Sequence, residues 1–212
     1  AQSLDHATRL SDRFKACEKA TDKLSDLVND MLQISSLNWK ENIVYTEEDI
    51  VAVTQNCVRE FEDVAAMKKI NLRLFLPQEA IQMKMDVSHI HTALGNLLKN
   101  AFHYTQAGGT VKVRLDRTGD EVSITVTDTG IGIEKENLTR VFDQFYRADN
   151  GMQANPEGAG LGLPFVKKVA EKHNGMVMVT SEITKGSSFT IRLPVHHNIQ
   201  ETQRPEQFRQ EA

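Results

Sequence analysis

The sequence of 212 residues lacks the features that mark several classes of protein. Its two cysteines, Cys17 and Cys57, match neither a disulfide framework nor a zinc spacing, so we expect a reducing, cytoplasmic compartment. No apolar run approaches the roughly 18 residues of a membrane helix, and no charged-then-apolar leader is visible, so we expect no secretion signal and no direct membrane contact. Basic residues number 25 against 29 acidic ones, and the net charge of −4 argues against nucleic acid as the main partner.

Apolar residues make up 40% of the chain, which is enough to bury a core, and their pattern changes along the sequence. Residues 1–42 contain no glycine or proline, and the positions from Leu10 to Ser35 alternate steps of four and three. This is the seam of a long, coiled-coil-like helix that needs a partner helix. The partner is either this chain's own domain or, as we favour, an intermolecular bundle.

Residues 43–195 mix helical and strand patterns, and residues 196–212 are polar and predict a tail or linker. The strands fall mostly in hairpins with helices between them, which favours the α+β class with one mixed sheet covered by helices on one face. The predicted elements are a helix from about 46 to 68, strands at 70–76 and 81–85, a helix at 87–104, a hairpin of 110–117 and 121–128, a helix at 161–174 ended by Gly175, and a closing hairpin of 176–181 and 187–193.

Six of the twelve glycines lie between positions 130 and 162, and five of these fall in the strings Asp128–Ile133 and Gly158–Leu163. The second string opens a predicted helix, where glycines let backbone N–H groups approach a phosphate. A long loop precedes this string and a hairpin follows it, which argues against a dinucleotide-binding βαβ unit. No Gly-Lys-Ser/Thr string is present, so a P-loop is excluded.

Polar residues on the helix at 87–104 and at the end of a strand could bind a nucleotide. Asn96 and Asn100 are four apart and share a helix face, which His103 extends. A carboxamide oxygen binds Mg²⁺ when substrate phosphates complete the shell, although a solvated face is the alternative. The Asp128 carboxylate can accept a hydrogen bond from an amino group such as that of adenine, and capping its own turn is the alternative.

These segments together resemble the sensor histidine kinases of two-component systems. Asn96-Leu-Leu-Lys-Asn-Ala-Phe-His-Tyr104 is similar to their N box, Asp128–Ile133 to their G1 box, Val141–Asp149 to their F box and Gly158–Leu163 to their G2 box. The resemblance implies a Bergerat-type ATP-binding fold, an α/β sandwich with a mixed sheet, for residues 43–195. It also implies that residues 1–42 are part of the dimerisation and phosphotransfer domain.

The resemblance also assigns roles to individual residues. Asn100 would hold Mg²⁺, Asn96 would act at the phosphates, and Arg147 would stabilise the charge of the γ-phosphate during transfer. The aromatic Phe142 and Phe145 would anchor a lid by packing. The other residues expected to bind ATP are His103, Tyr104, Asp128, Gly130, Gly132, Gly158, Gly160, Leu161 and Gly162.

Two departures from the family pattern concern histidines. His103 stands where the family usually has lysine or arginine, and a neutral imidazole is a weaker partner for phosphate. The family's phosphoacceptor lies in an H box, His-Glu-x-x-Thr/Ser-Pro, and no such string occurs here. We expect the chain to be a fragment that lacks this histidine. The remaining histidines, His6, His89, His91, His173, His196 and His197, are predicted to lie at the surface.

The resemblance implies a protein histidine kinase that transfers the γ-phosphate of Mg²⁺-ATP to a histidine outside this chain. Its partners would be a second copy, through the N-terminal helix, and the receiver domain of a response regulator. The full-length protein would be anchored in the inner membrane. Two alternatives stay open: an ATPase of the gyrase, chaperone and mismatch-repair group, and a non-catalytic dimeric scaffold. The ATPases carry a water-activating glutamate where Asn96 stands, which argues against the first.

Overall fold

The structure is a computed structural model that describes residues 21, 43–148, 151 and 159–196. The predicted N-terminal seam, Gly158 and most of the predicted C-terminal tail lie outside these residues, so those predictions stay predictions. The described elements are β1 (Thr46–Asp49), α2 (Ile50–Arg59), α3 (Glu62–Lys68), β2 (Asn71–Phe75), β3 (Gln82–Met85), α4 (Val87–Tyr104), β4 (Thr110–Thr118), β5 (Glu121–Asp128), a 3₁₀ turn (Lys135–Asn137), α6 (Gly162–Lys172), β6 (Met176–Glu182) and β7 (Gly186–Pro194).

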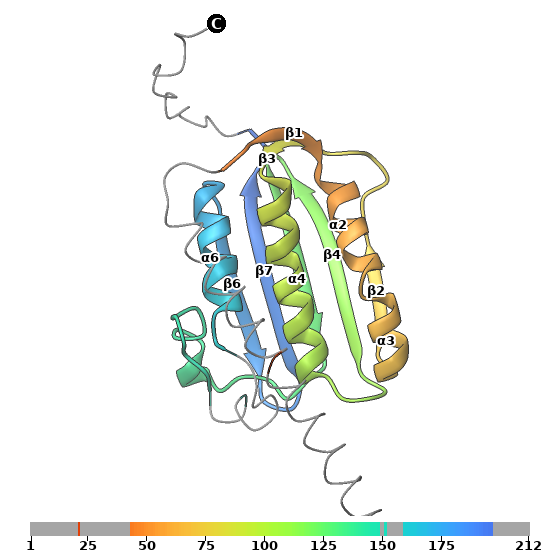
Figure 1. Cartoon of the computed structure of the whole chain (residues 1–212), viewed down its shortest axis with the longest axis vertical. Helices are drawn as coiled ribbons and strands as arrows, with labels where there is room; N and C mark the ends of the chain where they lie inside the picture. Colours follow the sequence, from red (N-terminus) through yellow and green to blue (C-terminus); the bar gives the residue numbers. More distant parts are fainter. Residues whose placement is uncertain (1–20, 22–42, 149–150, 152–158, 197–212) are drawn as a thin grey trace, which may run out of the picture.

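Five strands form one mixed sheet in the order β2-β4-β5-β7-β6. The β2 and β4 strands are parallel, and the other neighbours are antiparallel. The helices α2, α3, α4 and α6 lie on one face of this sheet, with α4 in the middle (Figure 1). The α+β prediction, with one mixed sheet covered on one face, is therefore confirmed.

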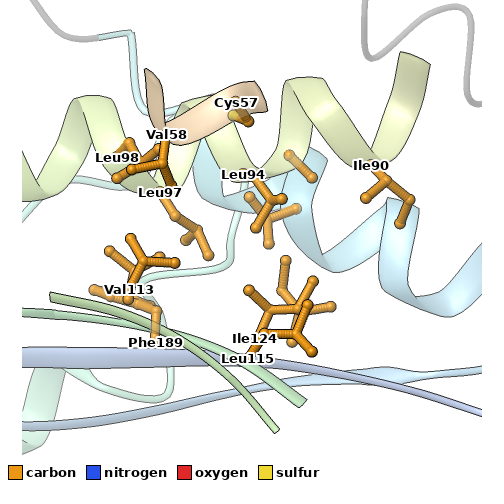
Figure 2. Packing of buried hydrophobic residues seen from close by; sticks show 14 of the residues in the cluster. Cys57, Val58, Ile90, Leu94, Leu97, Leu98, Val113, Leu115, Ile124 and Phe189 are labelled. Carbon is orange, nitrogen blue, oxygen red and sulfur yellow. The ribbon is translucent and has the colours of Figure 1, made fainter. Parts of the chain in front are cut away.

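The core fills the layer between the sheet and the helices. On β4 and β5 alternate residues point into it, which is the period of a strand with one buried face, and Val113 and Ile124 are fully buried. On α4 the buried residues recur every three or four positions and include Ile90, Leu94 and Leu97. Figure 2 shows these helix residues above the strand residues, with Cys57 of α2 completing the layer.

Helix α4 is the element that the sequence predicts best. Its bounds, Val87–Tyr104, coincide with the predicted helix. It begins where the Asp86 side chain accepts a hydrogen bond from the His89 N–H at 2.9 Å, which satisfies one of the free amides of the first turn. It follows β3, which pairs with β1 in a separate two-stranded sheet at one end of the layers (Figure 1).

The prediction of one helix from 46 to 68 is wrong. Residues Thr46–Asp49 form β1, which pairs antiparallel with β3, and the helical segment is divided into α2 and α3. The acids of Thr46–Asp49 resemble a helix start, but only Asp49 is a cap, accepting from the Val51 N–H at 3.0 Å. The pairing of Thr46–Asp49 with β3 outweighs the local helix signal of these four residues.

The end of α6 also differs from its prediction. The left-handed residue after the helix is Asn174, with φ of +56°, and not Gly175. A side chain at Gly175 would collide with the carbonyl oxygen of Arg192 on β7, so close strand packing explains that glycine. His173, the residue before Asn174, is fully buried, which contradicts its predicted surface position. His89 and His91 are half-buried, and His196 is exposed.

No helix in the described part of the chain is long and apolar enough to cross a membrane.

Candidate functional site

The second half of α4 carries a buried amide that has no partner among the residues that the structure describes. Asn96 is 8% exposed, and its Nδ2 has no hydrogen-bond acceptor among the described residues. A buried donor without a partner costs about 1–3 kcal/mol, so it marks a position where a ligand can supply the acceptor. The start of α6 lies against this side chain, since a Cβ at Gly162 would lie 3.5 Å from Asn96 Cγ.

Asn100 and His103 follow on the same helix. Asn100, one turn after Asn96, is half-buried, and His103 in the last turn is exposed. The predicted polar face therefore runs from a buried position to the surface, as expected for a helix face at the edge of a core. Only Asn96 lies deep enough for its lost hydration to matter.

Asp128 ends β5 and is 6% exposed. Its Oδ1 accepts two backbone hydrogen bonds, from Gly130 N–H at 2.8 Å and from Ser187 N–H at 3.2 Å. Burial raises the pKa of this carboxyl above its usual range, and the two backbone bonds partly oppose the rise. None of the described residues donates to Oδ2, so one oxygen of a firmly held carboxylate can accept from a ligand.

The loop after Asp128 has a shape that only glycines allow. A Cβ at Gly130 would collide with the carbonyl oxygen of Tyr104, and Ile131 N–H donates to that oxygen at 3.3 Å. Gly132 has φ of +73°, and a Cβ there would collide with the carbonyl of Glu182 in the β6–β7 hairpin. The loop is therefore packed between the end of α4 and that hairpin.

Tyr104, the last residue of α4, meets the segment of the F box. The guanidinium of Arg147 hydrogen-bonds to the Tyr104 hydroxyl and also donates to the carbonyl of Gly151 at 3.3 Å. Burial raises the pKa of Tyr104, and the positive charge of Arg147 opposes the rise. The structure thus places Arg147 beside the end of α4.

The two phenylalanines of the F box differ from the prediction that both pack. Phe142 is half-buried, with its ring edge-on to that of Phe189 at 6.3 Å between centroids. Phe145 is 63% exposed, so its predicted packing role is wrong. Its backbone has φ of +62°, and its N–H donates to Gly160 at 3.0 Å, so the turn directs the ring outward. This bond connects the F box to the start of the G2 segment.

The G2 residues that the structure describes enter α6. Gly160 has φ of +72°, and a Cβ there would lie 2.9 Å from the carbonyl oxygen of Tyr146. Leu161 is 3% exposed and Gly162 begins the helix, next to Asn96. These contacts bring the G2 segment to α4 and to the F box.

Sequence reasoning missed the contribution of the last hairpin. Ser187 donates to Asp128 through its backbone, and a Cβ at Gly186 would collide with the Asp128 carbonyl oxygen. The signal was the pair Gly186-Ser187 at the start of the closing strand, since a glycine there indicates a close backbone approach. The sequence alone does not show that β5 pairs with β7, so it does not identify Asp128 as the residue that Gly186 and Ser187 approach.

The assembled groups can recognise a neutral base and an anion. The Asp128 carboxylate accepts from an amino group, the Asn96 amide donates to an anionic oxygen, and Arg147 supplies positive charge. Among the described residues there is no group of three histidines, cysteines or acids that could hold a metal ion. A metal near Asn100 would therefore take most of its ligands from a bound molecule.

The profile of the family described as "Histidine kinase-, DNA gyrase B-, and HSP90-like ATPase" matches residues 85–197. Two curated relatives are the sensor-like histidine kinase SenX3 of Mycobacterium tuberculosis (strain ATCC 25618 / H37Rv) and the sensor histidine kinase RppB of Synechocystis sp. SenX3 is 34% identical over 190 residues, covering 89% of this chain and 46% of the relative. RppB is 31% identical over 195 residues, covering 90% and 42%. The chain thus spans less than half the length of these relatives.

Solved structures have the same fold. Full-length ShkA in complex with AMPPNP superposes with a TM-score of 0.72 at 26% identity, covering 83% of this chain and 36% of that one. The histidine kinase AdeS of Acinetobacter baumannii gives 0.69 at 25% identity, covering 87% and 84%. The histidine kinase ThkA, solved with the response regulator protein TrrA, gives 0.69 at 21% identity, covering 83% and 49%.

Proposed function

The chain belongs to the family of histidine kinase-, DNA gyrase B- and HSP90-like ATPases, and on that premise we propose that it is the part of a sensor histidine kinase that delivers the γ-phosphate of ATP to a histidine. ATP binding follows from the family and from the sensor kinases among its relatives. The observation that carries the proposal is the buried Nδ2 of Asn96 beside the start of α6, which has no acceptor within the described part of the chain. It can donate to a phosphate oxygen, and it cannot act as a base.

The site residues take the following roles in this proposal. The second oxygen of Asp128 accepts from the adenine amino group, and Tyr104 lies against the base. Asn96 donates to the phosphates, and Arg147 stabilises charge on the γ-phosphate during transfer. The turns at Gly130, Gly132, Gly160 and Gly162 let backbone approach the nucleotide, with His103, Phe145, Gly158 and Leu161 at its edge.

We also propose that Asn100 holds Mg²⁺. Its carboxamide oxygen is a ligand type that this ion accepts, and its half-buried position on the face of Asn96 places it towards the same molecule. One protein oxygen is enough when the phosphates of ATP supply others. The ion would neutralise phosphate charge, while Asn96 and Arg147 orient the chain of phosphates.

The partners in this proposal are a second copy of the protein and a response regulator. Residues 1–42 would form part of the dimerisation helix, and the acceptor histidine would lie on a segment that this chain does not contain. The solved complex of ThkA with a response regulator protein supports the same class of partner here. The domain would lie in the cytoplasm, where ATP is available, below a membrane anchor in the full-length protein.

Labelling with γ-labelled ATP tests the transfer. The chain alone should acquire no acid-labile label, and adding the upstream segment with its histidine should produce it. Asn100→Ala should abolish the label while the fold remains intact, because Asn100 lies on a polar face. Label on the chain alone that is lost in His6→Ala would contradict the proposal.

The gyrase and chaperone group remains the rival function, and hydrolysis distinguishes it. An asparagine at position 96 cannot take a proton from water, so we expect very slow hydrolysis. Rapid multiple-turnover release of inorganic phosphate by the chain alone would favour the ATPase. Failure to bind ATP at all would favour the non-catalytic scaffold.

A further inference from the structure

The hairpin between β6 and β7 is bonded to the loop of Asp128–Ile133 at both ends of that loop. At one end, Ser187 N–H donates to Asp128 Oδ1 at 3.2 Å. At the other end, Ile133 N–H donates to the side-chain oxygen of Ser181 at 2.8 Å. Between them, Thr184 N–H donates to the carbonyl of Ile131 at 2.9 Å.

Ser181 is the residue that connects these bonds. Its hydroxyl donates to the carbonyl of Gly186 at 2.8 Å, and its oxygen lies 2.9 Å from the hydroxyl oxygen of Ser187. Because a hydroxyl has one proton, the Ser187 hydroxyl must donate to Ser181. Ser181 therefore accepts from Ile133 and Ser187 and donates to Gly186, which uses its full bonding capacity.

The backbone contacts leave this hairpin little freedom to move away. A Cβ at Gly132 would collide with the carbonyl of Glu182, and a Cβ at Gly186 would collide with the carbonyl of Asp128. The loop and the turn thus touch backbone to backbone, and the half-buried Ser181 hydroxyl fixes the register of the contact.

We propose that Ser181 is a positioning residue for nucleobase recognition, which acts through the loop of Asp128–Ile133 without touching the nucleotide. This inference rests on the proposed function, in which the free oxygen of Asp128 accepts from the adenine amino group. Guanine presents a carbonyl oxygen at the same ring position, which the carboxylate repels. Discrimination between the two bases therefore depends on the position of Asp128. Ser181 bonds to Ile133 at the far end of the Asp128–Ile133 loop, and it bonds to Ser187, whose N–H donates to Asp128.

The test measures ATP and GTP affinities by calorimetry in the wild type, Ser181→Ala, Ser181→Thr and Ser188→Ala. Ser188 is the matched control, because it lies on the same strand β7 and its hydroxyl is 3.0 Å from that of Thr127 on the paired strand β5. Among the described residues, its side chain makes no hydrogen bond to the loop of Asp128–Ile133. We expect Ser181→Ala to lower the ratio of ATP to GTP affinity about tenfold, the scale of one buried hydrogen bond. Ser181→Thr should restore the ratio, and Ser188→Ala should not change it.

Amide exchange supplies a readout that needs no nucleotide. The Ile133 amide should be protected in the wild type and in Ser188→Ala, and should exchange faster in Ser181→Ala. If Ser181→Ala does not fold, Ser187→Ala, which removes one of the same bonds, must lower the ratio and the protection. An unchanged ratio in a folded Ser181→Ala, or an equal fall in Ser188→Ala, overturns the inference. A wild type that binds neither nucleotide overturns the proposed function instead, whatever the exchange of Ile133.

Discussion

The two ends of helix α4 lie beside buried carboxylates that are bonded in different ways. At its N-terminal end, Asp86 accepts from the backbone of His89 and, at 3.0 Å, of Val44, so that both oxygens are used. Beyond its C-terminal end, Asp128 receives two backbone N–H groups on one oxygen, and no described residue donates to the other. Both carboxylates are less than a tenth exposed, so burial alone does not separate them.

His173 beside the N-terminal end of α4 and Asn96 in the middle of that helix show the same contrast. The buried ring of His173 accepts from Asp86 N–H at 2.9 Å through Nε2, and its Nδ1 lies 2.8 Å from the carbonyl of Val169. Tyr45 packs edge-on against that ring and donates to the carbonyl of Lys172 at 2.7 Å. Asn96, in contrast, has a buried donor for which no described residue supplies an acceptor. A polar cluster that closes its own bonds stabilises the fold, and one that leaves bonds open is suited to a ligand.

The largest expected effect comes from breaking the hydrogen bonds of the polar cluster around Asp86. Asp86→Ala removes the cap of α4 and the acceptor of Val44, so we expect the free energy of unfolding to fall by about 3 kcal/mol. Urea denaturation measures this loss. The fraction that remains folded should bind ATP with unchanged affinity, and weaker binding with unchanged stability would reverse the assignments of the two ends.

Asp128→Asn should have a slightly smaller effect, on affinity instead of stability. The amide oxygen can keep the bonds from Gly130 and Ser187, while the amide nitrogen meets the adenine amino group donor to donor. We expect ATP affinity to fall roughly 30-fold, or about 2 kcal/mol, the scale of a hydrogen bond to a charged group. Calorimetry measures the affinity. An affinity equal to that of the wild type would show that Asp128 serves only its own turn.

Replacing Asn96 should raise stability while it removes function. Asn96→Leu keeps the approximate shape and removes a donor that has no partner among the described residues, so we expect the unfolding free energy in urea to rise by about 1 kcal/mol. In the protein extended by the upstream segment with its histidine, the same change should abolish phosphate transfer. The matched change His173→Leu removes groups that have partners and should lower stability. A loss of stability in both variants would mean that Asn96 is a structural residue.

The pH dependence should have opposite signs at the two ends and is the smallest effect. Burial alone would raise the pKa of Asp86, but its hydrogen bonds to His89 and Val44 and the charge of His89 together outweigh burial and lower that pKa. The stabilising contribution of Asp86 is therefore lost as pH falls from the unfolded value through the lowered pKa. The pKa of Asp128 is raised by burial, so stability is lost at that position as pH rises through the raised pKa. Relative to the wild type, Asp128→Asn should therefore gain stability as pH rises above the ordinary carboxyl pKa of 3.8, and Asp86→Asn should lose stability as pH rises towards that value from below. Urea titrations on both sides of that value measure both slopes, and slopes of the same sign would contradict the assignment.

The parts of the fold that the sequence predicted are those with a strong local period. Helix α4 shows repeated apolar positions, and the strands β4 and β5 alternate around a turn at Gly119, whose φ is +61°. The acidic residues of Thr46–Asp49 led to the wrong prediction of a helix, because their pairing with β3 makes this segment a strand. His173 was placed at the surface because its partners, Asp86 and Tyr45, are distant in the sequence.

The site shows the same division. Its residue types were predictable from four short motifs, and the structure places Gly162 beside Asn96 and Arg147 beside Tyr104. The outward turn of Phe145 was not predictable, since a positive φ at a phenylalanine has no local signature. The roles of Ser181 and Ser187 depend on strand pairing across the sheet, which no local pattern contains.

The most direct test of the contrast between the two ends of α4 is a nuclear magnetic resonance titration of the isotope-labelled chain with Mg²⁺-ATP. Shifts should appear at the side-chain amide of Asn96 and at the backbone amides of Gly130, Ile131 and Ser187. The amides of Val44, Asp86 and His89 should keep their positions, because the cluster at that end is closed. Shifts centred on the Asp86 cluster, with Asn96 unchanged, would contradict the account.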